Sequence, residues 1–208
     1  DGCQAEYVRV PYADMGLTPI PDGVTDEKAL FVGDILSSGY FGAQLCKIVP
    51  GDTVAVIGAG PVGLCTMQCA RLLGAAKVLA FDVDASRLKL ALDLGLADDG
   101  CNPNLCHVEE FVYGHTLGRG ADGVIEAAGT PQSFEMAWKI ARPNAVVALV
   151  AMYEQPQVLP LPEMYGKNLI FKTGGVDAIH CDTLLRLIDA GRLNTDFLIT
   201  HRAPLNDI

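Results

Sequence analysis

The sequence lacks the long apolar run and the basic cluster that would point to a membrane or a nucleic acid. No apolar stretch in its 208 residues approaches the ~20 residues needed to span a bilayer. The net charge is -10 and no segment is rich in Lys or Arg, so we expect neither nucleic acid nor membrane as a partner. The opening residues, Asp1 to Glu6, do not resemble a signal peptide, because no basic region precedes an apolar core.

Metal-ligand spacing is also missing. The 4 His are scattered, and the 7 Cys form no C-x-x-C pair, although Cys65 and Cys69 lie one helical turn apart and Cys101 and Cys106 are close in sequence. A metal site built from these cysteines is therefore not expected. We interpret them as reduced, mostly buried thiols of a cytoplasmic protein.

The composition is that of a folded domain. Half of the residues (50%) are hydrophobic and 19% are charged, which excludes a disordered chain. The length suits one large domain, or one domain with part of a second. The chain opens without Met and ends abruptly with the residues Pro204 to Ile208, and we interpret it as a fragment. Ala5 to Val10 alternates like a strand, with a second short strand expected near Thr18 to Ile20, and neither has an obvious partner later in the chain.

From Thr53 onward, short apolar runs alternate with longer amphipathic stretches. Thr25 is placed to cap an earlier helix through Val32, and a second helix is expected over Ser37 to Ile48. Apolar strands separated by crossover helices predict an α/β fold with a doubly wound parallel sheet of the Rossmann type. The expected strands are 53–58, 77–82, 122–127, 145–151 and 168–173, with a weak one at 97–101, and the expected helices are 61–73, 85–94, 108–116, 131–141 and 181–190.

The sharpest local signal is the G-x-G-x-x-G pattern that follows the first of these strands. Gly58 permits the tight turn, Gly60 lets the backbone approach a pyrophosphate, and Gly63 lets the helix pack close to the strand. The first helical turn, with Pro61 and Val62, presents the positive end of the helix dipole to the phosphates. The pattern predicts a dinucleotide-binding site.

An acidic residue lies where such a site needs one. Asp82 ends the second strand 19 residues after Gly63, near the ~20 residues typical of the carboxylate that binds the adenosine ribose. Because a carboxylate there repels an extra phosphate, Asp82 favours NAD over NADP. Alternatively, Asp82 caps the helix that begins near Ala85. Arg87 is a candidate to flank the adenine, or else an exposed helical arginine.

Two further strand ends are candidates for the cofactor cleft, because ligands of open parallel sheets bind beyond the carboxyl ends of the strands. Ala127, Ala128 and Gly129 end the fourth strand, and these small residues leave room for a cofactor. The residues that end the fifth strand could wall the nicotinamide or belong to the ordinary sheet core: Val150, Ala151 and Met152.

These residues, taken together, resemble the zinc-containing medium-chain alcohol dehydrogenases. The similarity runs in register over essentially all 208 residues. It is carried by the segments Ala5–Pro11, Gly33–Ala43, Pro50–Gly63, Gly74–Val78, Gly120–Gly129 and Leu198–Arg202.

The resemblance implies two domains and a metal. Residues 1–22 would be a remnant of a GroES-like catalytic domain, and residues 23–208 an NAD-binding Rossmann domain truncated at its C-terminus. In that family zinc is held by a Cys, a His and a third ligand, and Asp34 falls on the third position. From the residues alone, Asp34 is a lone carboxylate among apolar neighbours that needs a partner or a metal, or else a helix cap after Gly33.

The resemblance also implies an activity: NAD-dependent interconversion of alcohols and aldehydes or ketones by zinc-assisted hydride transfer, in which Asp34 serves as a catalytic zinc ligand. We expect the chain alone to bind NAD, to hold no stoichiometric zinc and to be inactive. A homodimer or homotetramer is expected, with residues 168–173 as the pairing edge. The alternatives are a polyol, threonine or formaldehyde dehydrogenase, a zinc-free quinone reductase, which Asp34 disfavours, or a non-catalytic nucleotide-binding module.

Overall fold

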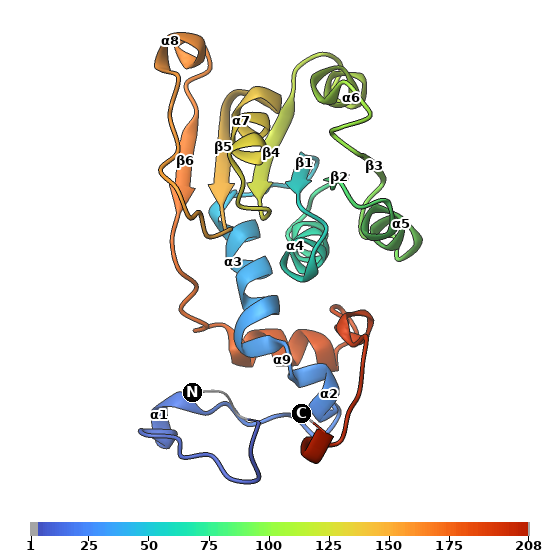
Figure 1. Cartoon of the computed structure of the whole chain (residues 1–208), viewed down its shortest axis with the longest axis vertical. Helices are drawn as coiled ribbons and strands as arrows, with labels where there is room; N and C mark the ends of the chain where they lie inside the picture. Colours follow the sequence, from blue (N-terminus) through green and yellow to red (C-terminus); the bar gives the residue numbers. More distant parts are fainter. Residues whose placement is uncertain (1–3, 208) are drawn as a thin grey trace.

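The computed structural model describes residues 4–207 and is built around a six-stranded, all-parallel sheet (Figure 1). The strand order is β3-β2-β1-β4-β5-β6, so the direction of winding reverses between β1 and β4. This arrangement confirms the predicted doubly wound α/β fold. The strands are β1 (Thr53–Ile57), β2 (Lys77–Phe81), β3 (Asp99–Cys101), β4 (Ala121–Glu126), β5 (Ala141–Leu149) and β6 (Ile170–Thr173).

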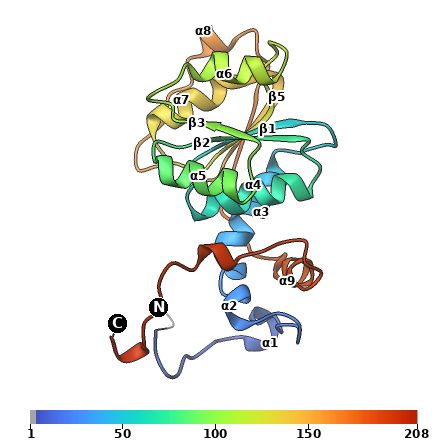
Figure 2. The same cartoon turned by 90° about the vertical axis from the view of Figure 1, so that its right-hand side faces the viewer.

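Helices cover both faces of the sheet, α3, α4 and α5 on one side and α6 and α7 on the other (Figure 2). Val54 and Val56 of β1 pack into the first layer, while Ala55 and Ile57 pack into the second. Because all four side chains are buried, β1 is apolar without interruption. The helices are α2 (Asp26–Ala29), α3 (Ser37–Leu45), α4 (Pro61–Leu72), α5 (Ala85–Asp93), α6 (Val108–His115), α7 (Pro131–Ile140), α8 (Leu161–Met164) and α9 (Cys181–Asp189), with 3-10 turns at Asp196–Leu198 and Leu205–Asp207.

The N-terminal segment differs from the prediction. Within the described residues 4–20 no strand forms, and the only regular element there is the short helix α1 (Ala13–Gly16). A strand needs a neighbour to satisfy its backbone groups, and this segment lies away from the sheet, near the C-terminal residues (Figure 1). Tyr7, in the middle of the first expected strand, is 90% exposed. The expected strands at Ala5–Val10 and Thr18–Ile20 are therefore wrong.

The helical region before β1 is confirmed in part. The Thr25 hydroxyl accepts a hydrogen bond from the Lys28 N–H, as expected of an N-cap, but α2 ends at Ala29 rather than Val32. A π-helical turn over Val32–Leu36 then runs directly into α3. Since Gly33 does not break the helix, Asp34 is not the N-cap of a new one.

The prediction that the cysteines are reduced, buried thiols is also confirmed only in part. Cys46, Cys65 and Cys69 are buried free thiols, as expected, but Cys101 and Cys106 are joined by a disulfide. Cys3 lies outside the described residues, as do the other residues of the opening tripeptide. Within residues 4–207, every helix is too short or too polar to cross a bilayer.

Candidate functional site

Two glycines of the fingerprint are required by the packing of α4 against the sheet. Gly58 has φ 97°, a conformation that side-chain-bearing residues rarely adopt, and its N–H donates to the Phe81 carbonyl (2.7 Å). A methyl group on Gly63 would collide with the Gly58 carbonyl oxygen. Gly58 and Gly63 thus bring the start of α4 against the end of β1, as predicted.

Gly60 has a different role, because the described part of the protein leaves the space next to it open. It is the N-cap residue of α4, and a Cβ built there would have Arg87 Nη1, at 4.0 Å, as its nearest neighbour. Pro61 occupies the first turn, where its missing N–H leaves no bond unmade. The first turn of a 12-residue helix therefore faces open space with its backbone N–H groups, an arrangement that suits an anion such as a pyrophosphate.

Asp82 follows β2 and is buried, with 9% of its surface exposed. One carboxylate oxygen accepts a hydrogen bond from the Ala59 N–H (2.7 Å), and the other accepts one from the Asp84 N–H (2.8 Å). A carboxylate offers about four acceptor positions, so about two remain for ligand hydroxyls. The N-cap of α5 is Asp84, which accepts from the Ser86 and Arg87 N–H groups, so the alternative that Asp82 caps α5 is wrong.

A cleft of about 370 Å³ connects these groups. This volume is within the range of small-molecule sites. Six of the predicted residues line it: Gly58, Gly60, Asp82, Arg87, Ala127 and Ala128. The rest of the lining comes from residues that the sequence did not single out, among them Val83, Pro103, Asn104, Thr130, Gln132 and Met136.

The turn after β4 is held by a carboxylate that the sequence analysis missed. Glu126 is fully buried, and its Oε1 accepts hydrogen bonds from the N–H groups of Ala128 and Gly129, both at 2.8 Å. Its other oxygen accepts from the Tyr153 hydroxyl. A charged residue at the end of an otherwise apolar strand was the available signal, since such a group needs partners.

The residues that end β5 are not brought into the same cleft. Val150 packs toward Gly42 of α3, and Ala151 and Met152 approach Gly129 through the Ala151 side chain and the Met152 carbonyl. The Met152 side chain is 94% exposed. Their contact with a nicotinamide stays a prediction.

Comparison with known proteins agrees with this geometry. A family model described as zinc-binding dehydrogenase matches residues 61–179. An alcohol dehydrogenase of Cupriavidus necator is 40% identical over 100% of the chain and 58% of its own length. The structure of alcohol dehydrogenase TADH from Thermus sp. ATN1 superposes with a TM-score of 0.93 at 37% identity, covering 99% of this chain and 60% of that one.

The chain belongs to the zinc-binding dehydrogenase family. A further relative, the NADP-dependent isopropanol dehydrogenase of Thermoanaerobacter brockii, is 32% identical over 97% of the chain and 58% of that protein. The chain thus spans somewhat more than half the length of the curated dehydrogenases it matches. Membership agrees with the resemblance stated from the sequence.

Asp34, which the sequence suggested as a zinc ligand, lies on the surface. Its carboxylate is exposed in the π-helical turn and accepts a hydrogen bond from the Ser38 hydroxyl (3.2 Å). The burial that the sequence suggested for this charge is therefore wrong. Among residues 4–207, no group of three or more His, Cys, Asp or Glu side chains is placed to hold a metal ion. The described part of the chain therefore does not supply a complete zinc site by itself.

Proposed function

We propose that the chain is the NAD-binding part of an oxidoreductase that interconverts alcohols and aldehydes or ketones. The observation that carries this proposal is the position of the Asp82 carboxylate beside the N-terminus of α4, in one cleft with Gly58 and Gly60. The helix end supplies an anion site, and the carboxylate supplies acceptors for a diol. Together they match the two polar parts of an adenosine diphosphate.

A bound nicotinamide cofactor would supply hydride transfer, and the residues of this chain bind and orient it. The backbone N–H groups of the first turn of α4 would hold the pyrophosphate, with Gly60 leaving the space for it. Arg87, exposed on α5 but part of the cleft lining, lies next to that space and would face the adenosine. The turn Ala127–Gly129 would border the cofactor where β4 ends.

The choice of NAD over NADP rests on charge. The Asp82 carboxylate is already fixed by the Ala59 and Asp84 N–H groups, so it cannot turn away from an additional ribose phosphate without losing both bonds. Repulsion between the negative Asp82 carboxylate and the negative phosphate of NADP would disfavour NADP binding. The T. brockii relative is named as NADP-dependent, so this preference varies among the relatives and has to be measured here.

Asp34 would contribute one zinc ligand in the whole enzyme, where carboxylate oxygen is an accepted donor. Because Asp34 lies on the surface, its carboxylate could bind a zinc ion whose other ligands come from the rest of the enzyme. The hydrogen bond from the Ser38 hydroxyl would orient the carboxylate. A homodimer or homotetramer paired through β6 is part of the same proposal, because β6 is the edge strand of the sheet.

Calorimetric titration of the purified chain with NADH and with NADPH tests the proposal. We expect saturable NADH binding and much weaker NADPH binding. Asp82→Asn should weaken NADH binding about tenfold, as expected for hydrogen bonds to a charged group, and should narrow the difference between the two cofactors. Asp93→Asn, which removes an exposed carboxylate from the other end of α5, is the matched control.

The possible contrary results separate the parts of the proposal. Tighter binding of NADPH than of NADH would overturn the role given to Asp82 and leave the cleft as a dinucleotide site. Absence of binding by either cofactor would overturn the proposed function of the cleft itself.

A further inference from the structure

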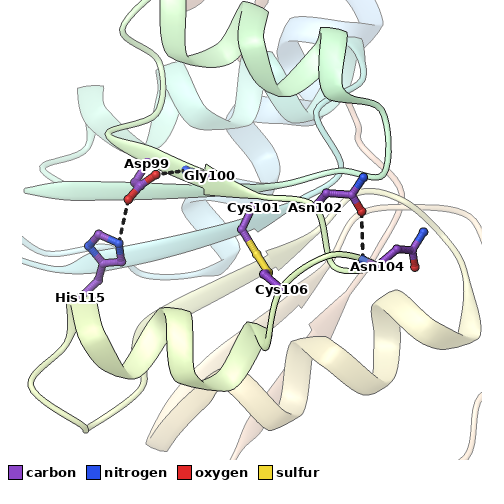
Figure 3. The surroundings of a disulfide bond; sticks show 7 residues. All are labelled: Asp99, Gly100, Cys101, Asn102, Asn104, Cys106 and His115. Carbon is purple, nitrogen blue, oxygen red and sulfur yellow. Dashed lines mark hydrogen bonds and ion pairs between the residues drawn. A yellow bond between two sulfur atoms is a disulfide. The ribbon is translucent and has the colours of Figure 1, made fainter.

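The disulfide lies beside the proposed cofactor cleft, in a part of the chain that the proposed function does not use. Cys101 is the last residue of β3, and Cys106 comes two residues before α6 begins. Their Cα atoms are 6.5 Å apart, within the range that a disulfide spans. Figure 3 shows the bond closing the loop between the strand and the helix.

The closed loop is tied to the cleft by hydrogen bonds. The Asn102 side-chain amide donates to the Val83 carbonyl (2.8 Å), one residue after Asp82. The Asn104 N–H donates to Asn102 Oδ1 (2.9 Å), as drawn in Figure 3, and the Cys106 N–H donates to the Asn102 carbonyl (3.1 Å). The loop therefore has one defined conformation that bears directly on the turn after β2.

Two residues inside the loop form part of the cleft wall. Pro103 and Asn104 line the cleft together with Asp82 and Arg87. The proposed function places Asp82 and Arg87 at the adenosine end of the cofactor. Any loosening of the loop thus changes the adenosine end of the cleft and leaves the glycine turn at Gly58 in place.

The disulfide is accessible to small molecules on one side. Cys101 is 8% exposed, but Cys106 is half-buried and lines a second cavity of about 620 Å³ between α6 and α7. By contrast, burial raises the pKa of the Cys46 and Cys65 thiols to about 12, and both are sealed in the core. Among the cysteines within residues 4–207, Cys101 and Cys106 are the pair that forms a disulfide, and Cys106 can be reached from a cavity.

We propose that Cys101 and Cys106 form a thiol–disulfide exchange site for small thiols and disulfides, and that its oxidised state tightens dinucleotide binding. The effect on binding rests on the proposed function of the cleft. In the reducing direction, a thiolate of a small dithiol attacks the Cys106 sulfur, the bond to Cys101 breaks, and a mixed disulfide forms. The second thiolate of the dithiol then displaces Cys106, so the dithiol is oxidised to its cyclic disulfide and both cysteines become thiols.

The physical reason for the coupling is conformational entropy. With the bond closed, the loop already has the conformation that walls the cleft, so the cofactor does not have to order it. With the bond open, part of the binding free energy is spent on ordering Asn102 to Leu105. We expect about fivefold weaker NADH binding by the reduced chain, at the lower end of usual couplings between two sites.

The test uses the whole 208-residue chain before and after treatment with dithiothreitol, with two measurements on each sample. Mass spectrometry of alkylated protein counts the thiols that treatment releases, and calorimetry gives the NADH dissociation constant. We expect two additional alkylated cysteines, at positions 101 and 106, together with the weaker binding. Cys101→Ser with Cys106→Ser should bind like the reduced chain and no longer respond to dithiothreitol. Cys181→Ser, which removes a free cysteine from α9, should behave like the unchanged chain.

Each contrary result has its own meaning. Free thiols at positions 101 and 106 in the untreated chain that a small disulfide such as oxidised dithiothreitol cannot join would overturn the exchange site. Equal NADH affinity in both redox states would overturn the coupling and leave the proposed cofactor site standing. Absence of NADH binding in both states would overturn the proposed function and the coupling with it.

Discussion

The Tyr153 hydroxyl donates a hydrogen bond of 2.5 Å to the Glu126 carboxylate, linking the end of β4 to the segment after β5. Burial and the neighbouring Glu126 charge raise the pKa of Tyr153, so the hydroxyl stays protonated beyond about pH 10, where free tyrosine ionises. Because the same carboxylate accepts from the Ala128 and Gly129 N–H groups, one buried side chain holds the turn that borders the proposed cofactor cleft.

Glu126→Ala is expected to lower the free energy of unfolding by about 2 kcal/mol or more, because it leaves a cavity and three unpaired donors. NADH affinity should fall as well, since the turn is no longer held. Glu126→Gln is the matched control: its carbonyl oxygen can still accept both backbone N–H groups and its amide can donate to the Tyr153 oxygen. Urea unfolding and NADH titration measure both effects. If Glu126→Gln lost as much stability and NADH affinity as Glu126→Ala, the negative charge of Glu126, and not its hydrogen bonds, would be what holds the turn.

Gly60 and Gly63 provide a pair of substitutions that separates folding from binding. Gly63→Ala should destabilise the fold by about 1–3 kcal/mol, because the new methyl group meets the Gly58 carbonyl oxygen in a close-packed contact. Gly60→Ala should keep a cooperative unfolding transition, because its φ of -71° suits alanine and its surroundings are open. Its methyl group would stand where the pyrophosphate is expected, so NADH binding should weaken. Unchanged NADH affinity in Gly60→Ala would contradict the anion site proposed at α4.

The strands were predictable where burial on both faces makes a run continuously apolar. β1 and β2 end within a residue of their expected bounds for this reason. β5 begins at Ala141, whereas the expected strand began at Ala145. The first residues of β5 include Arg142 and Pro143, which a sequence pattern does not assign to a strand, so the prediction missed them. The Arg142 guanidinium bonds to the Asp122 carboxylate of β4 (2.7 Å) where the register shifts, a contact that only the folded sheet creates.

The site was predictable where its chemistry is local in sequence. The glycine turn and Asp82 lie within one strand–helix–strand unit, so their spacing is visible in the chain. Asn104 and Gln132 reach the cleft only because β3 and β4 are neighbours of β2 and β1 in the sheet, and no spacing rule announces that. The exposure of Asp34 could not be predicted from its apolar sequence neighbours, because Val32 and Leu36 are buried while the Asp34 side chain faces outward.

The open edge of the sheet gives a prediction about assembly. Ile170 of β6 is 50% exposed on that edge, and Ile170→Lys should place a charge where a second sheet would pair. We expect the unchanged chain to sediment as a dimer or tetramer in analytical ultracentrifugation and the variant to dissociate at the same concentration. Ile179→Lys, at a 72% exposed position outside the sheet, should leave assembly unaffected. A monomeric unchanged chain would overturn the proposed pairing through β6.

Asp98 predicts a component of the acid sensitivity of the fold. Burial opposes its ionisation, but the Val78 N–H (2.7 Å) and the Arg71 guanidinium (3.0 Å) outweigh that effect and lower the pKa of Asp98 in the folded chain. A carboxyl group whose pKa is lowered by folding stabilises the protein above its unfolded pKa of about 3.9, and this contribution is lost as the pH falls through the folded value.

Urea unfolding should therefore show Asp98→Asn less stable than the unchanged chain at neutral pH, by a modest amount because the side chain is partly exposed. The difference should shrink as the pH drops below about 4. A difference that stays constant down to the acid transition would mean that the asparagine side chain disturbs packing, and that the ionised carboxylate contributes nothing.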